Sequence, residues 1–222
     1  MSDSQFSWPL FDKAPLVGIV RNLPAIDVIQ LLPLYQESGL TTLEITMNTP
    51  GAEDLIRYAR QHYANDLNVG AGTVCTTDDL TRALAAGAQF IVSPIVSKPV
   101  IQECVGQGVP VLPGAFTPTE VYEAWSLGAS MVKVFPATSL GPGYIKDLKA
   151  PLSQIKLLPT GGVTLSNLAD FFRAGADGVG VGSQLFNKGL IQEKDWTGLK
   201  AHFQEFAKLM PANTDKGDPT RP

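Results

Sequence analysis

The sequence predicts an α/β protein, a (β/α)8 TIM barrel with a short extra segment at its N-terminus. Three observations carry the prediction: apolar runs of strand length bounded by Gly and Pro, amphipathic segments of helix length between them, and a glycine that recurs before successive strands. Alternating strands and helices imply right-handed βαβ units and a parallel sheet. A chain of 222 residues, 44% of them hydrophobic, suffices for one such barrel.

The strands are expected where short apolar runs are dry on both faces, as parallel strands are. These runs lie at residues 16–20, 42–47, 68–72, 90–93, 109–112, 131–135, 155–158 and 178–182. Eight parallel strands in about 200 residues suit a closed barrel. An open, doubly wound sheet is the alternative, because the hydrophobic periodicity of the two folds is the same.

Helices are expected between the strands, where the apolar residues recur at helical spacing. The clearest segments are residues 25–38, 52–63, 77–86, 98–106, 117–127 and 165–174. A glycine stands just before four of the strands, at intervals of roughly 40–50 residues, which is the length of one helix, one strand and two loops. These glycines are Gly39, Gly87, Gly128 and Gly175.

The barrel domain is expected to span residues 15–210. Residues 1–14 are interpreted as a segment that precedes the first strand, and residues 211–222 as a disordered tail, because they are mostly Pro, Asn, Thr, Asp, Lys and Gly. The start of the chain has no secretory signal, and no apolar run approaches the length of a membrane span. We therefore expect a cytoplasmic protein.

The charge balance limits the partners. Seventeen basic and 21 acidic residues give a net charge of −4. A mildly acidic chain is a poor candidate for binding nucleic acid or an anionic membrane, so a local site must hold any anionic substrate. Neither a metal nor another cofactor is expected, because His62 and His202 fall in helical segments away from the strand ends and Cys75 and Cys104 form no CxxC pair.

Lys133 is the most informative residue. It lies between Met131 and Phe135 on one face of a strand that is dry on both sides. Burial lowers the pKa of a lysine, and a neutral amine is a nucleophile for a carbonyl group. A buried ion pair with Glu44 and no chemistry is the alternative.

Two more charged residues interrupt strands. Glu44 can point at the same cavity as Lys133 if the sheet curls, and a carboxylate there would carry the proton transfers that imine chemistry needs. Arg21 ends the first strand and offers a planar fork for a carboxylate or phosphate. The alternatives are simple charge balance for Glu44 and an ion pair at the rim for Arg21.

Two glycine turns follow the last two strands. Pro159-Thr160-Gly161-Gly162-Val163 comes after the seventh strand, and Gly180-Val181-Gly182-Ser183 ends the eighth. Loops at these places in a barrel often cradle a phosphate with backbone N–H groups. Tight turns without a ligand are the alternative.

In this order and spacing, the motifs resemble the 2-keto-3-deoxy-6-phosphogluconate (KDPG) and 4-hydroxy-2-oxoglutarate (KHG) aldolase family. The resemblance covers residues 15–208. The matching pieces are IVR at 19–21, LEIT at 43–46, GAGTV at 70–74, IVSP at 91–94, PGAFTPTE at 113–120, KVFPA at 133–137, GPGYIKDLK at 141–149, PTGGV at 159–163 and GVGS at 180–183.

The resemblance implies a homotrimeric, cofactor-free class I aldolase that cleaves a small keto acid phosphate to pyruvate and glyceraldehyde 3-phosphate, and 4-hydroxy-2-oxoglutarate to pyruvate and glyoxylate. It implies Lys133 as the Schiff-base lysine and Glu44 as the proton shuttle. It also implies residues that bind the substrate's carboxylate, pyruvyl, hydroxyl and phosphate groups. These are Arg21 and Thr73, Pro94 and Phe135, Thr160, and Gly161, Gly162, Gly182 and Ser183.

Two cues about the sugar epimer conflict. Some family members have an arginine four residues after the glutamate, where this chain has Asn48, and that is similar to the branch specific for the 6-phosphogalactonate substrate (KDPGal). Thr160 before the double glycine instead resembles the gluconate branch. Two other functions remain open: a phosphosugar epimerase or isomerase, which would not need Lys133, and a phosphosugar-binding protein without catalysis.

Overall fold

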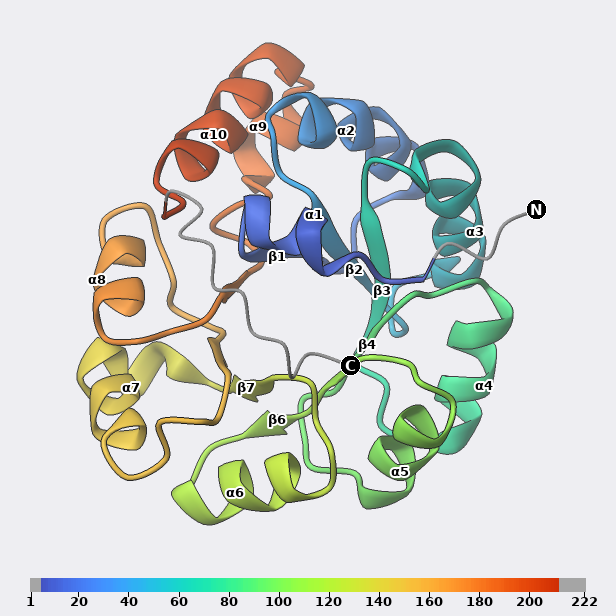
Figure 1. Ribbon diagram of the computed structural model, residues 1–222. Helices are drawn as coiled ribbons and strands as arrows, with labels where there is room; N and C mark the ends of the chain where they lie inside the picture. Colours follow the sequence, from blue (N-terminus) through green and yellow to red (C-terminus); the bar gives the residue numbers. More distant parts are fainter. Residues whose placement is uncertain (1–4, 212–222) are drawn as a thin grey trace.

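The computed structural model describes residues 5–211, in which parallel strands form a ring and helices surround it (Figure 1). The strands are β1 Leu16–Val20, β2 Thr42–Thr46, β3 Asn68–Gly72, β4 Ile91–Val92, β5 Val111–Leu112, β6 Gly114–Ala115, β7 Val132–Val134, β8 Leu157–Pro159 and β9 Val179–Val181. The helices are α1 Trp8–Lys13, α2 Ala25–Glu37, α3 Ala52–Tyr63, α4 Thr77–Ala85, α5 Lys98–Gly106, α6 Pro118–Ser126, α7 Gly141–Lys149, α8 Leu168–Arg173, α9 Lys188–Gln192 and α10 Trp196–Lys208, with a 3-10 turn at Ala137–Ser139. None of these helices is both long and apolar enough to cross a membrane.

The ring consists of two parallel sheets that meet at two seams. The first sheet has the order β5-β4-β3-β2-β1-β9 and the second β6-β7-β8. At one seam β5 and β6 are halves of a single run, separated by Pro113, which has no N–H to donate. At the other, the Asp177 N–H donates to the Leu157 carbonyl (2.9 Å), and Thr160 bridges to Gly180. The strands therefore close into a barrel, and the doubly wound alternative is wrong.

The predicted elements agree with the structure except at their ends. Strands 16–20 and 68–72 have the expected bounds. The strand expected at 109–112 begins later and continues beyond Pro113 into β6. Gly114 explains how the chain passes this point, because a Cβ there would overlap the backbone carbonyl of Pro94. The tail expected at 211–222 lies outside the described residues, apart from residue 211.

The larger apolar core lies between the helices and the outer face of the strands. Tyr35 of α2 shows how tightly it packs: the ring stacks on Phe186 at 6.0 Å, and the hydroxyl donates to the Thr42 carbonyl (2.6 Å). A Cβ at Gly18 would stand 2.7 Å from that hydroxyl. Glycine on β1 therefore lets α2 lie directly against the sheet.

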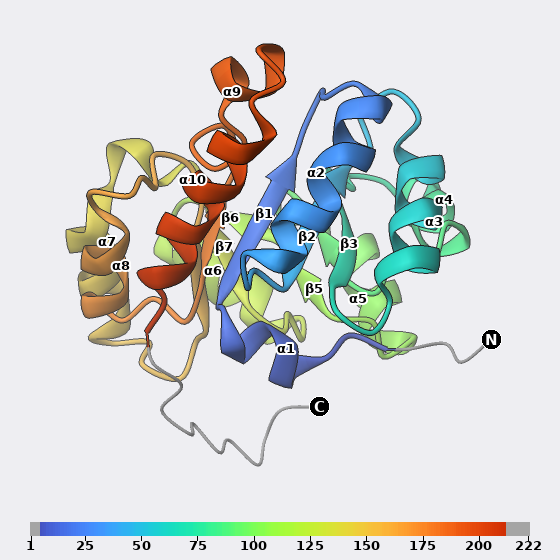
Figure 2. The same ribbon diagram turned by 90° about the horizontal axis from the view of Figure 1, so that it is seen from above.

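A second apolar cluster fills the barrel interior near the beginnings of the strands, and α1 closes that end (Figure 2). The Phe6 ring contacts Trp8 at 4.7 Å and Phe90 at 5.2 Å. The segment is also held by Asn68, whose side chain accepts from the Ser7 N–H (2.7 Å) and donates to the Ser7 carbonyl (2.9 Å). The buried members of the cluster are Phe11, Val17, Phe90, Val92, Leu112, Met131 and Leu158.

Candidate active site

The functional side chains point into the barrel because they occupy alternate positions on their strands. On β7, Lys133 pairs in register with Gly114 on one side and Leu158 on the other. On β2, Glu44 pairs with Ile19 and Gly70. The closed ring therefore brings a lysine and a glutamate from distant parts of the chain into one interior.

Lys133 is only 2% exposed, and its amine lies 5.0 Å from the centre of the Phe135 ring. Burial lowers the pKa of this amine; the charge of Glu44 opposes the shift, and that of Arg21 adds to it. An ammonium group buried in this way loses its hydration, so the equilibrium shifts toward the neutral amine. The expected face of the strand, with Met131, Lys133 and Phe135 together, is confirmed because Met131 is buried in the interior cluster.

Glu44 is 1% exposed, and neither of its carboxylate oxygens has a hydrogen-bond partner among the described residues. Burial raises the pKa of this carboxyl group, while the charges of Lys133 and Arg21 pull it down. A Cβ at Gly72 would lie 2.5 Å from Oε1, so glycine makes the space for the carboxyl group. A buried carboxylate without hydrogen bonds is costly, which favours a chemical role over a structural one.

Hydrogen bonds on both sides of Arg21 position it at the end of β1. The N–H of Asn22 donates to the Thr49 hydroxyl (3.0 Å), and the Thr46 hydroxyl donates to the Val20 carbonyl (3.3 Å). The two threonine hydroxyls are 2.9 Å apart. Asn22 has a positive φ of 53°, a conformation that such contacts must sustain. The turn after β1 is thus held by the segment after β2.

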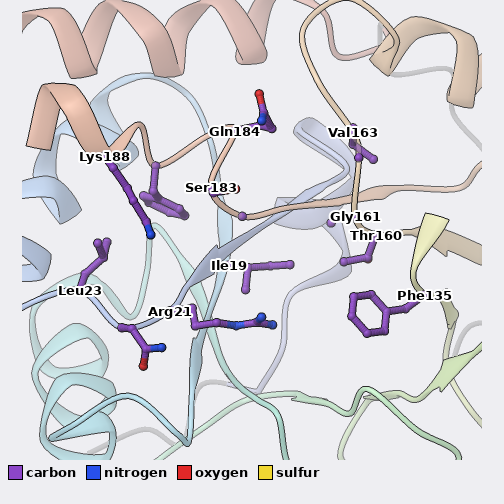
Figure 3. Close-up of a pocket in the computed structure, with 15 residues that line it drawn as sticks. Ile19, Arg21, Leu23, Phe135, Thr160, Gly161, Val163, Ser183, Gln184 and Lys188 are labelled. Carbon is purple, nitrogen blue, oxygen red and sulfur yellow. The ribbon is translucent and has the colours of Figure 1, made fainter. Parts of the chain in front are cut away.

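A cavity of about 350 Å³ opens at the carboxyl ends of the strands (Figure 3). Its wall is made of the ends of β1, β7, β8 and β9 and of the loops that follow them. The lining residues are Ile19, Arg21, Asn22, Leu23, Phe135, Thr160, Gly161, Gly162, Val163, Gly180, Gly182, Ser183, Gln184, Phe186 and Lys188.

The glycine loops allow the backbone itself to line this cavity. Gly161 and Gly162 have φ values of 91° and 73°, which favour glycine. A Cβ at Gly162 would stand 2.8 Å from the Cα of Thr138, and one at Gly180 would overlap the Thr160 hydroxyl. Because these glycines also line the cavity and carry no side chains, their backbone groups are open to a ligand, as a phosphate-binding loop requires.

The structure brings most of the expected binding residues to the cavity, but not all of the expected site. Four residues do not line it: Lys133, Glu44, Thr73 and Pro94. Lys133 adjoins it through Phe135, which does line it. The expected residues that line it are Arg21, Phe135, Thr160, Gly161, Gly162, Gly182 and Ser183.

Thr73 and Pro94 lie on the β3–β4 side of the barrel, away from the lined wall. Thr73 directly follows Gly72 and has a positive φ of 58°, which is unusual for a threonine. Pro94 packs its backbone against Gly114. Their expected contacts with a substrate stay predictions.

Lys188 is a cavity residue that the sequence reasoning missed, together with Gln184 and Ile19. A signal was present. Lys188 is the first residue of α9, directly after the Asn187 cap. A cation suits the C-terminal end of a helix better than its beginning, so a lysine there calls for another reason.

As for metals, residues 5–211 contain no group of three or more His, Cys, Asp or Glu side chains placed to hold an ion. The polar groups that line the cavity are two cations, two hydroxyls, two side-chain amides and backbone. They suit an anionic organic ligand, with a nearly dry amine and carboxyl group next to it.

Comparisons with known proteins agree with this arrangement. The family described as KDPG and KHG aldolase matches residues 10–202. The 2-dehydro-3-deoxy-6-phosphogalactonate aldolase of Escherichia coli K12 is 37% identical over 183 residues, which is 82% of this chain and 89% of that protein. The 2-dehydro-3-deoxy-phosphogluconate aldolase of Treponema pallidum is 38% identical over 159 residues, 68% of this chain and 75% of that protein. A solved structure described as native KDPGal superimposes with a TM-score of 0.83 at 33% identity, covering 92% of this chain and 96% of that one.

Proposed function

The chain belongs to the KDPG and KHG aldolase family, and on that premise we propose a class I aldolase in which Lys133 and Glu44 carry the reaction. A class I aldolase is a metal-independent lyase that forms a Schiff base with its keto acid. The observation that carries the residue assignment is the burial of Lys133, 2% exposed and beside Glu44.

The reaction begins at the neutral Lys133 amine, which attacks the C2 carbonyl of a 2-keto-3-deoxy-6-phospho sugar acid. The carbinolamine loses water to give a protonated imine. The C3–C4 bond then breaks, its electron pair moves into the imine, and Glu44 accepts the C4 hydroxyl proton, directly or through water. Glyceraldehyde 3-phosphate leaves. The enamine is protonated at C3, and hydrolysis releases pyruvate and the free lysine.

The cavity supports this assignment by its chemistry. Arg21 suits a carboxylate or phosphate, and the Gly161-Gly162 and Gly182-Ser183 turns suit a phosphate. Thr160 offers a hydroxyl for a substrate hydroxyl. Thr73 and Pro94 belong to the same proposal as contacts of the pyruvyl end. Neither a phosphosugar epimerase nor a phosphosugar-binding protein would need the buried Lys133 and Glu44.

The substrate epimer belongs to the proposal as well. We take the KDPG-type substrate as the principal one, with KDPGal and 4-hydroxy-2-oxoglutarate as further substrates. The relatives include enzymes named for both phosphorylated epimers. Asn48 resembles the branch specific for the galactonate substrate, whereas Thr160 resembles the gluconate branch. Rate constants measured in parallel on the three substrates decide their order.

Borohydride reduction in the presence of pyruvate tests the central step. We expect a pyruvate-derived adduct on the peptide that contains Lys133, and none in the Lys133→Arg variant. Native, folded protein that forms no adduct, while releasing no pyruvate from any of the three substrates, contradicts the proposal.

A homotrimer and a cytoplasmic location complete the proposal. Large apolar side chains remain exposed on successive β–α units, at Ile95 (50%), Phe116 (42%) and Tyr122 (55%). Such side chains are typical of a surface that another subunit covers. Sedimentation should give the mass of a trimer, and a monomer at working concentration would contradict the assembly.

A further inference from the structure

Lys188 is a charged residue of the cavity to which the proposed reaction gives no task. Its side chain reaches into the cavity from α9, with the amine toward the side on which Leu23 and Arg21 lie (Figure 3). Among residues 5–211, the side chain of Lys188 forms no hydrogen bond or ion pair. Other lysines, such as Lys149 and Lys194, pair with Asp177 and Asp27.

The charges of the cavity wall are all of one sign. Of the described residues that line it, Arg21 and Lys188 are cations and none is an aspartate or glutamate. The whole chain has the opposite balance, with a net charge of −4. Two cations facing one cavity in an acidic protein repel each other unless an anion lies between or beside them.

The two cations stand at different places along the cavity, although both are exposed. Arg21 directly follows β1 and is among the charges that shift the pKa values of both Lys133 and Glu44, so it lies toward the reacting groups. Lys188 is not among those charges, and it follows the Gly182-Ser183 turn by five residues. A ligand that engages both cations therefore has two anionic groups, one near the reacting carbonyl and one near the rim.

We infer that Lys188 pairs with the terminal phosphate of the substrate and makes the enzyme select phosphorylated keto acids over their unphosphorylated counterparts. The inference rests on the proposed function and names a residue that determines its specificity. A lysine on a flexible stem acts as a point charge, which suits a phosphate that arrives from solvent. The backbone N–H groups of the glycine turns orient the phosphate, and the Lys188 ammonium group balances its negative charge.

The test compares Lys188→Met and Lys188→Arg on a 2-keto-3-deoxy-6-phospho sugar acid and on the same acid without the phosphate. At the exposed rim one charged contact corresponds to about a tenfold effect. We expect Lys188→Met to lose about tenfold in kcat/KM on the phosphorylated acid, through KM, and less than about twofold on the other. Lys188→Arg should keep most of the activity. Equal losses on both substrates, or no loss on either, overturn the inference.

Lys98→Met is the matched control. Lys98 is also exposed and is also the first residue of a helix, α5, which lies across the ring from α9 (Figure 1). It does not line the cavity, so its loss should leave the preference for phosphate unchanged. Raising the salt concentration should reduce that preference in the wild type and Lys98→Met, and much less in Lys188→Met.

Failure of the proposed function can be told apart from failure of this inference. If the wild type forms no borohydride adduct and releases no pyruvate, the aldolase proposal fails. Titration calorimetry with glycerol 3-phosphate still decides the role of Lys188, since it needs no catalysis. Binding that weakens about tenfold in Lys188→Met, and not in Lys98→Met, supports the phosphate contact; unchanged binding contradicts it.

Discussion

The two ends of the barrel use the same strands for opposite purposes. Met131, directly before β7, is buried in the apolar cluster that α1 closes at the amino end. Two residues further along the chain, Lys133 of β7 faces the reactive end. A step of two residues is about 6.6 Å along a strand, and it returns the side chain to the same face. The apolar cluster and the reactive side chains can therefore lie on the same inward face of the strands.

The apolar cluster at the amino end, together with α1, keeps water away from the reactive side chains at the other end. Because α1 and the cluster around Phe90 exclude water from below, Lys133 and Glu44 have little hydration, and burial moves both pKa values toward the neutral forms. Stability should depend on the amino end and catalysis on the carboxyl end. The predictions below test that division.

Replacing Lys133 should have the largest effect. The variant Lys133→Met removes the amine and keeps most of the side-chain volume. We expect kcat/KM to fall by about 10⁴-fold or more, because methionine has no amine to form the Schiff base. A coupled assay of pyruvate release measures the loss, and circular dichroism verifies the fold. A folded variant with more than a few per cent of wild-type activity would contradict the role of Lys133.

Replacing Phe90 should have a large effect on stability and little effect on catalysis. Its ring is fully buried and touches Phe6, so Phe90→Ala should cost about 3–5 kcal/mol in the free energy of unfolding. The folded fraction should keep kcat within about twofold. Urea unfolding and the pyruvate assay measure the two quantities. Ile26→Ala is the control, because Ile26 is 63% exposed and its loss should cost at most about 0.5 kcal/mol.

Two glycines on β3 provide a matched pair. A Cβ at Gly70 would meet the Phe90 ring at 2.5 Å, and one at Gly72 would meet Glu44 Oε1 at 2.5 Å. Gly70→Ala should lower stability by about 1–3 kcal/mol and leave kcat nearly unchanged. Gly72→Ala should displace the flexible carboxyl group and lower kcat by about tenfold or more, with a smaller loss of stability. The division between the two ends is wrong if the two variants show the same profile.

The pH dependence of stability should show the smallest effect. The pKa of Glu44 is raised in the folded state, so as the pH rises above its ordinary 4.5 the unfolded chain releases the proton first. The free energy of unfolding of the wild type, relative to that of Glu44→Gln, should therefore decrease as the pH increases above 4.5. Lys133 has the opposite sign: its pKa is lowered from 10.5, so the wild type should lose stability relative to Lys133→Met as the pH falls below that value.

Unfolding curves measured from pH 4 to pH 10 give both differences. A flat difference for Glu44→Gln across this range would mean that the carboxyl group titrates alike in the folded and unfolded states. That result would remove the argument that burial prepares it for proton transfer.

The sequence alone was enough for the local features. Strand and helix positions follow from hydrophobic spacing, which is a property of neighbouring residues. Lys133 and Glu44 could be recognised because a charge inside an apolar run stands out without any knowledge of the fold. The glycine turns after the last two strands could be recognised in the same way.

The tertiary structure alone decided what depends on distant segments. Closure of the ring rests on the bridge between Thr160 and Gly180 and on the continuation of β5 into β6 past Pro113. An isolated strand has the same sequence pattern in an open sheet as in a closed one. The cavity gathers Arg21, Thr160 and Lys188 from elements far apart in the chain. The place of Lys188 at the first position of α9 is unusual for a cation, but only the structure assigns it to the cavity, because other segments build the wall that it faces.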